Sequence, residues 1–144
     1  MKFSERIASR LELIPDCIGK IINKIKQLSL SEEELFDIKL CLQEALVNAV
    51  KHGNKFNPGL IAEVSVEVAD KYLMIQVKDQ GEGFDEKAVP SPVRTENLTK
   101  TSGRGVYLIK ELMDKVEFFD RGSGVKMTKF FNKEIHREPK RRKA

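Results

Sequence analysis

Apolar residues recur along the chain with two different periods, which separate helical from extended segments. From Pro15 to Leu28 the isoleucines return every three or four residues, as they do on one face of a helix, and proline suits a first helical turn. A second helix is predicted from about residue 32 to Gly53, because Ser31 and Glu34 have the spacing of a capping box. Both helices are therefore expected to have one buried face.

Period-two alternation marks the strands. Residues 62 to 79 alternate apolar and polar positions on either side of a break at residues 70 and 71, which predicts two antiparallel strands. The weaker alternation from Ser4 to Leu13 is a candidate first strand. A second hairpin is predicted from residues 116–119 and 125–131, around the turn Arg121–Gly124.

The segment from Gly81 to Gly105 has no periodicity and is interpreted as a long functional loop, followed by a third helix from Val106 to Asp114. Three helices and about five strands, most of them joined as hairpins, predict an α+β fold. We expect a two-layer α/β sandwich with three helices on a mixed, mainly antiparallel sheet.

Chain length and charge indicate one domain and a separate tail. The 144 residues suffice for a single core, so residues 1–135 are predicted to form one domain. Residues 136–144 carry five basic residues and one acidic residue, which accounts for the whole formal net charge of +4. The tail is expected to be disordered, and nucleic-acid binding through it is the weakest functional alternative.

The remaining composition points to an ordinary soluble protein. The chain has no apolar run long enough to span a membrane, and its charged beginning is not followed by an apolar leader segment, so we expect a cytoplasmic protein without a membrane partner. Cys17 and Cys41 lie in apolar helical patterns and are interpreted as buried free thiols rather than as a disulfide or metal ligands.

The second helix has a polar face opposite its apolar stripe, and this face gathers near the end of the helix. Its members are Glu44, Asn48, Lys51 and His52. A solvated surface is one interpretation of this face. Asparagine, however, is a mediocre helix former and gains little from an exposed position in mid-helix, so Asn48 favours a functional role.

Asp79 stands where the second predicted strand ends, just before Gly81 and Gly83. Glycine has no Cβ, so the backbone at these positions can turn and come close to a ligand. A fixed carboxylate at this place can accept a hydrogen bond from an exocyclic amine such as that of adenine. An ordinary Asp-Gly turn is the alternative.

A third motif precedes the third predicted helix, and its residues are Thr101, Ser102, Gly103, Arg104 and Gly105. Backbone N–H groups at a helix N-terminus attract anions, and an arginine adds positive charge. The motif lacks the spacing of a P-loop, and no strand precedes it. It also lacks the spacing and position of a dinucleotide-binding fingerprint.

The order of these three motifs resembles the N, G1 and G2 boxes of the GHKL ATPase superfamily, which has the Bergerat nucleotide-binding fold. The stretches EALVNAVKHGN, DQGEGFD and SGRGVYLIKELMD are most similar to the stand-alone, RsbW-like anti-sigma factor serine-protein kinases. The resemblance covers about residues 14 to 130.

The resemblance implies a role for each motif. Glu44 is the expected general base and Asn48 the expected Mg²⁺ ligand, while Asp79 is expected to read adenine in a pocket shaped by Gly81 and Gly83. Lys51 is a candidate phosphate contact, and His52 is interpreted as structural or helix-capping. Gly103 and Gly105 match the hinge of an ATP lid, whose amides approach the phosphates. They are expected to contact ATP together with Thr101, Ser102 and Arg104.

The implied activity is phosphorylation of serine by ATP with Mg²⁺. The expected protein binds a sigma factor, phosphorylates a STAS-type anti-anti-sigma protein, and forms a homodimer. The alternative is a non-catalytic module of the same fold, in which ATP only gates binding to a protein partner.

Overall fold

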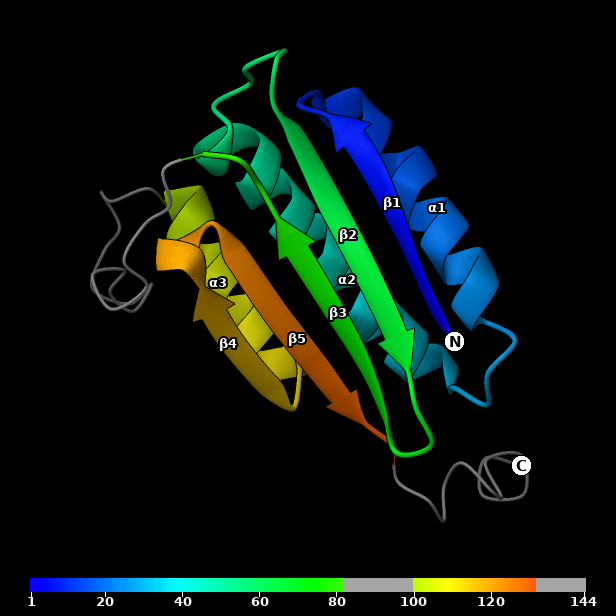
Figure 1. The fold of residues 1–144 in the computed structure, drawn as a ribbon. Helices are drawn as coiled ribbons and strands as arrows, with labels where there is room; N and C mark the ends of the chain where they lie inside the picture. Colours follow the sequence, from blue (N-terminus) through cyan, green and yellow to red (C-terminus); the bar gives the residue numbers. More distant parts are fainter. Residues whose placement is uncertain (82–99, 132–144) are drawn as a thin grey trace.

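The computed structural model describes residues 1–81 and 100–131, with the backbone alone for residues 100–104. Gly83, most of the predicted loop and the basic tail lie outside the described residues. Five strands form a single sheet in the order β1-β2-β3-β5-β4 (Figure 1). The strands are β1 (Lys2–Ala8), β2 (Ile61–Val68), β3 (Tyr72–Lys78), β4 (Lys115–Phe119) and β5 (Gly124–Phe130).

All four strand pairings are antiparallel, and two of them are the predicted hairpins. The α+β class is confirmed, although the described sheet contains no parallel pair and so is not mixed. The first strand starts at Lys2 and ends at Ala8, earlier than the alternation from Ser4 to Leu13 indicated. Residues Leu11–Leu13 form a short 3₁₀ turn instead, which leads into the first helix.

Three α-helices cover one face of the sheet, as Figure 1 shows. They are α1 (Ile14–Ile25), α2 (Glu32–Val47) and α3 (Lys100–Leu112). Their inward side chains and those of the sheet form one apolar core, in which Ile21, Ile38 and Ile75 have no exposed surface. The removal of these apolar side chains from water is the main stabilising contribution to the fold.

Both cysteines lie in this core, as predicted. Cys17 of α1 and Cys41 of α2 are buried free thiols. Burial raises the pKa of Cys17 to about 11 and that of Cys41 to about 12. Each thiol therefore stays protonated at neutral pH.

Helix α2 begins with the predicted capping box. The Ser31 hydroxyl accepts a hydrogen bond from the Glu34 amide at 3.0 Å, and the Glu34 carboxylate accepts one from the Ser31 amide at 2.8 Å. Two N–H groups that have no partner within the helix are thereby satisfied.

Helix α3 begins at Lys100 rather than at Val106, so the interpretation of residues 81–105 as loop throughout is wrong for its last turns. The Thr-Ser-Gly-Arg-Gly motif lies within the helix instead of in front of it. Threonine, serine and glycine are weak helix formers, which is why the pattern gave no helical signal. Packing of α3 against α2 compensates for this weakness, and Val106 is buried there.

The opposite face of the sheet carries mainly polar side chains, as alternation predicts for a solvated face. Arg6 of β1 and Glu63 of β2 form an ion pair across it at 3.1 Å. None of the helices within residues 1–81 and 100–131 has the length and apolar character that crossing a bilayer requires.

Candidate functional site

Segments far apart in the sequence meet at one end of the sheet and enclose a pocket. They are the end of α2, the end of β3, the middle of α3 and the β4–β5 hairpin. Its apolar walls include Val77, Ile109, Phe118 and Val125. Its polar side chains include Asn48, His52, Asp79 and Ser123. An apolar slot with a few fixed polar groups is the usual form of a small-molecule site.

The end of α2 widens into a π-helical turn, Asn48–Gly53, before the chain leaves the helix. The Asn54 amide donates to the Ala49 carbonyl at 2.7 Å, and two residues with left-handed backbone follow, Lys55 and Phe56. π turns are rare and occur frequently at functional sites. The predicted helix thus reaches Gly53, but its last turn is not α-helical.

Asn48 lies at the start of this π turn with an unsatisfied oxygen. Its side-chain Oδ1 is buried and has no hydrogen-bond partner among the described residues. An unpaired buried acceptor destabilises a protein, so this oxygen is a candidate contact for a ligand. Mg²⁺ prefers oxygen ligands and takes most of its coordination from phosphates and water, which fits a single amide oxygen. The described residues contain no cluster of three or more His, Cys, Asp or Glu side chains that could hold a metal ion by themselves.

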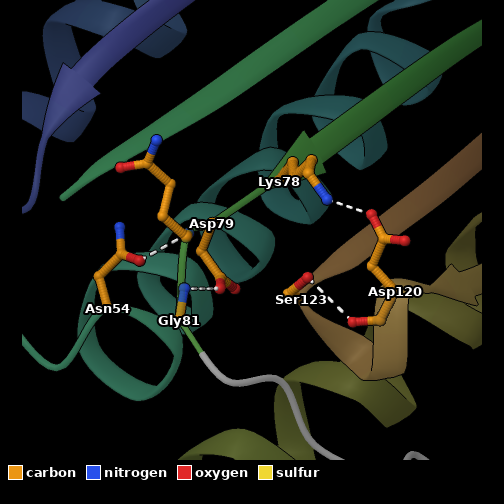
Figure 2. Close-up of polar contacts among 7 residues, drawn as sticks. Asn54, Lys78, Asp79, Gly81, Asp120 and Ser123 are labelled. Carbon is orange, nitrogen blue, oxygen red and sulfur yellow. Dashed lines mark hydrogen bonds and ion pairs between the residues drawn. The ribbon is translucent and has the colours of Figure 1, made fainter.

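Asp79 directly follows β3 and is only 6% exposed. Its carboxylate accepts a hydrogen bond from the Gly81 amide at 2.8 Å, as Figure 2 shows. Burial raises the pKa of Asp79, whereas the hydrogen bond from Gly81 and the charge of Lys78 act in the opposite direction. Lys78 is paired with Asp120. The Asp79 carboxylate therefore retains acceptor capacity for an N–H donor in the pocket.

Two glycines make room for this carboxylate. A Cβ on Gly53 would overlap the Asp79 side chain, and a Cβ on Gly81 would overlap the Gly53 carbonyl. Sequence reasoning assigned Gly81 to the approach of a ligand. In the structure the close approach is between two segments of the protein itself, the end of α2 and the turn after β3.

Glu44 and Asn48 lie one helical turn apart and face α3 together. A Cβ on Gly105 would lie 2.8 Å from Glu44 Oε1 and 3.2 Å from Asn48 Nδ2. A side chain at this position would therefore have to displace the ends of both groups, and glycine lets α3 pack against them as they stand. The structure thus brings together three of the predicted site residues, and Asn48 also shares the pocket with Asp79.

Comparison with known proteins agrees with this geometry. Residues 7–129 match the family described as "Histidine kinase-like ATPase domain". The chain belongs to this family.

Within the histidine kinase-like ATPase family, its relatives include two proteins named "Serine-protein kinase RsbW". The one from Bacillus licheniformis is 38% identical over 117 residues, which are 75% of this chain and 72% of the relative. The one from Staphylococcus aureus is 32% identical over 110 residues, which are 71% of this chain and 69% of the relative. The predicted RsbW-like resemblance is thereby confirmed.

The remaining predicted residues of this ATPase domain are placed differently. Lys51 is exposed and does not line the pocket. His52 does line it, and its Nε2 is buried without a hydrogen-bond partner in the described residues, so its structural or capping role stays a prediction. Burial, and secondarily the charge of Lys51, lower the pKa of His52. Thr101, Ser102, Gly103 and Arg104 lie in the first turns of α3, where only the backbone is described.

Sequence reasoning missed the wall that the β4–β5 hairpin contributes. Ser123 and Phe118 line the pocket, yet the sequence around them indicated only a turn between two strands. It also missed Asn54, which is 2% exposed and hydrogen bonded on both sides of its amide group. The one available signal was an asparagine directly after the His-Gly pair at the end of a helix.

Proposed function

We propose that this chain is an ATP-dependent serine-protein kinase that binds ATP and Mg²⁺ in the pocket at the end of α2. One observation carries the proposal. A buried, unpaired amide oxygen on Asn48 and a buried carboxylate on Asp79 face the same pocket, and a second carboxylate, Glu44, lies one turn before Asn48. Asp79 can therefore contact the adenine ring, Asn48 can contact a cation bound to the phosphates, and Glu44 can accept a proton.

The Asp79 carboxylate would accept a hydrogen bond from the exocyclic amine of adenine, between the apolar walls that Val77 and Ile109 provide. Asn48 Oδ1 would hold Mg²⁺, which when bound offsets charge on the phosphoryl oxygens. Glu44 would take the proton from the serine hydroxyl of the protein substrate as the hydroxyl oxygen attacks the phosphoryl group that ATP transfers. The protein's own work is then positioning and electrostatic stabilisation.

The first turns of α3 would complete the phosphate site. The first amides of a helix have no acceptor within it and carry partial positive charge. Thr101, Ser102, Gly103, Arg104 and Gly105 belong to these turns and are proposed ATP contacts, as are Lys51, Gly81 and Gly83. Gly105 has a second role, since it lets α3 approach Glu44.

The proposed partners rest on the resemblance of the three motifs to the anti-sigma factor serine-protein kinases. We infer that the chain binds a sigma factor, phosphorylates a STAS-domain anti-anti-sigma protein and acts as a homodimer in the cytoplasm. Residues 1–135 would form the kinase domain, and the basic tail, residues 136–144, would be dispensable for phosphoryl transfer. Direct binding to nucleic acid is not part of the proposal.

The decisive experiment replaces the proposed base. With Mg²⁺, ATP and a cognate STAS-domain protein, Glu44→Gln should lower the rate of phosphoryl transfer by about 10²- to 10⁴-fold, the usual contribution of a general base. ATP affinity should remain, because Asp79 and Asn48 are intact. Glu33→Gln is the matched control, since Glu33 is an exposed carboxylate in the first turn of the same helix.

Two other outcomes would be informative. Equal transfer by Glu44→Gln and the unmodified protein would refute Glu44 as the base. ATP binding without transfer to any STAS-domain protein would instead indicate a nucleotide-gated binding module of the same fold.

A further inference from the structure

Three consecutive backbone amides at the end of β3 donate hydrogen bonds to three different groups. The Asp79 amide donates to the Ser123 carbonyl, the Gln80 amide to Asn54 Oδ1 and the Gly81 amide to the Asp79 carboxylate, each at 2.8 Å. Figure 2 shows the hydrogen bond that Asn54 accepts and the one that the Gly81 amide donates to the Asp79 carboxylate. The segment that carries the carboxylate is thus anchored to the β4–β5 hairpin on one side and to Asn54 on the other.

Asn54 belongs to a closed ring of hydrogen bonds outside the pocket. Its Nδ2 donates to the Ile61 carbonyl at 2.9 Å, the Ile61 amide donates to Gln80 Oε1 at 2.8 Å, and the Gln80 amide donates to Asn54 Oδ1. Nδ2 also donates to the Ser9 hydroxyl at 3.0 Å, which itself donates to the Leu60 carbonyl at 2.7 Å. A backbone N–H only donates and a carbonyl only accepts, so the orientation of the Asn54 amide is fixed by its partners.

The position of Asn54 in the chain gives this ring a functional meaning. Asn54 follows the π turn that begins at Asn48, and its backbone amide is bonded to the Ala49 carbonyl. The same residue therefore holds the end of α2 through its backbone and the turn after β3 through its side chain. Asn54 therefore connects Asn48, which is proposed to hold Mg²⁺, with Asp79, which is proposed to bind the adenine ring.

We propose that Asn54 is a positioning residue that determines nucleotide-base selectivity by holding Asp79 at a fixed place relative to Asn48. The inference rests on the proposed ATP site, but Asn54 itself does not line the pocket. Without its side chain, the Gln80 amide and the Ile61 carbonyl lose their buried partners. The Asp79 carboxylate is then free to turn toward water, and the hydrogen bond to the adenine amine weakens.

Affinities for two nucleotides test this role. Inosine triphosphate has a carbonyl in place of the exocyclic amine of ATP, so the unmodified protein should prefer ATP, with Mg²⁺ present in both titrations. Asn54→Ala should lower ATP affinity about tenfold, the equivalent of one hydrogen bond, and should change inosine triphosphate affinity by less than about threefold. Asn57→Ala is the matched control, because Asn57 is exposed and its side chain accepts a hydrogen bond from the Gly59 amide of the same loop, while its backbone bonds are unaffected by the substitution.

A second pair of variants separates positioning from general destabilisation. If Asn54 acts through Asp79, Asn54→Ala combined with Asp79→Asn should show no less ATP preference than Asp79→Asn alone. Ser9→Ala removes one acceptor of Asn54 Nδ2 and keeps the bond to Gln80. Ser9→Ala should weaken ATP binding about two- to threefold and leave inosine triphosphate binding nearly unchanged. If Asn54→Ala does not fold, this variant alone tests whether the hydrogen bonds of Asn54 affect base selectivity.

Three results would overturn the inference. One is an equal loss of affinity for ATP and inosine triphosphate in the Asn54 and Ser9 variants, which would show a structural role only. Another is an additive loss of preference in the double variant. The third is an unmodified protein that binds ATP without preferring it, which would also remove the role of Asp79, whereas no ATP binding at all would refute the proposed function itself.

Discussion

The two ends of α2 differ in how completely their polar and apolar groups are satisfied. At its start, the capping box pairs Ser31 with Glu34, and Ile38 is fully buried in the core. At its end, the π turn leaves buried atoms of Asn48 and His52 without hydrogen-bond partners in residues 1–81 and 100–131. One helix therefore combines a segment optimised for stability with a segment whose unsatisfied groups favour a ligand.

The difference between the two ends of α2 explains why the candidate site lies at the end of the helix. Unsatisfied polar groups are tolerated only when the surrounding structure is stable enough to hold them in place. The first half of α2 provides this stability through its packing on the sheet, and the last turn is carried on the same rigid element. We expect mutations at the two ends to separate stability from binding.

The largest effect is expected from Ile38→Ala in the first half of α2. Truncation of this fully buried side chain should lower the free energy of unfolding by about 3 kcal/mol, because apolar area is lost and a cavity remains. ATP affinity, measured where the variant is still folded, should stay within about twofold. Denaturant unfolding measures the free energy of unfolding, and nucleotide titration measures the ATP affinity. A fall in both would show that the first half of α2 also determines binding.

A smaller effect is expected from pH, which should change ATP affinity through the protonation of Asp79. Because burial raises the pKa of Asp79, this side chain protonates at a higher pH than an ordinary aspartate, whose pKa is about 3.9. ATP affinity should fall as pH decreases through the raised pKa, since the protonated carboxyl group is a poorer acceptor. The contribution of Asp79 to stability has the opposite sign, being present at low pH and lost as pH rises.

Titrations of ATP from neutral pH down toward the ordinary aspartate pKa of about 3.9, over the range in which the protein stays folded, would test this dependence, with Asp79→Asn as the control. The control should bind more weakly and should lack the component of the pH dependence that Asp79 contributes. The same pH dependence in both proteins would assign the titration to another group.

The smallest change in stability is expected at the end of α2, from Asn48→Ala. Removal of an unpaired buried oxygen, and its replacement by the best helix former, should leave the free energy of unfolding unchanged or raise it by up to about 1 kcal/mol. ATP affinity in the presence of Mg²⁺ should nevertheless fall at least about tenfold. A loss of stability as large as that of Ile38→Ala would show that both ends of the helix serve the fold.

Local patterns were sufficient for most of the fold. The capping box at Ser31 and the alternation in β2 and β3 each depend on neighbours close in sequence, and the structure confirms both. The start of α3 at Lys100 could not be predicted in this way, because contacts with α2 stabilise it and its own residues do not. Tertiary packing outweighed helix propensity at this point.

The candidate site was predictable in its motifs but not in its connections. Glu44, Asn48 and Asp79 were identified from their order along the chain. The contact of Gly53 with Asp79, the hydrogen bonds that join Asn54 to Ser9 and Gln80, and the wall around Ser123 all connect segments more than twenty residues apart. No short-range pattern encodes such contacts, so the residues that position the site became visible only with the fold.

The two buried thiols also have a practical use. The sequence contains only Cys17 and Cys41, and thiols with pKa values of about 11 and about 12 present almost no thiolate to alkylating reagents at neutral pH. A cysteine introduced at an exposed position such as Lys51 would therefore react selectively with a maleimide fluorophore. The natural chain can thus serve directly as the background for fluorescence measurements in the π turn that follows α2, without prior removal of its cysteines.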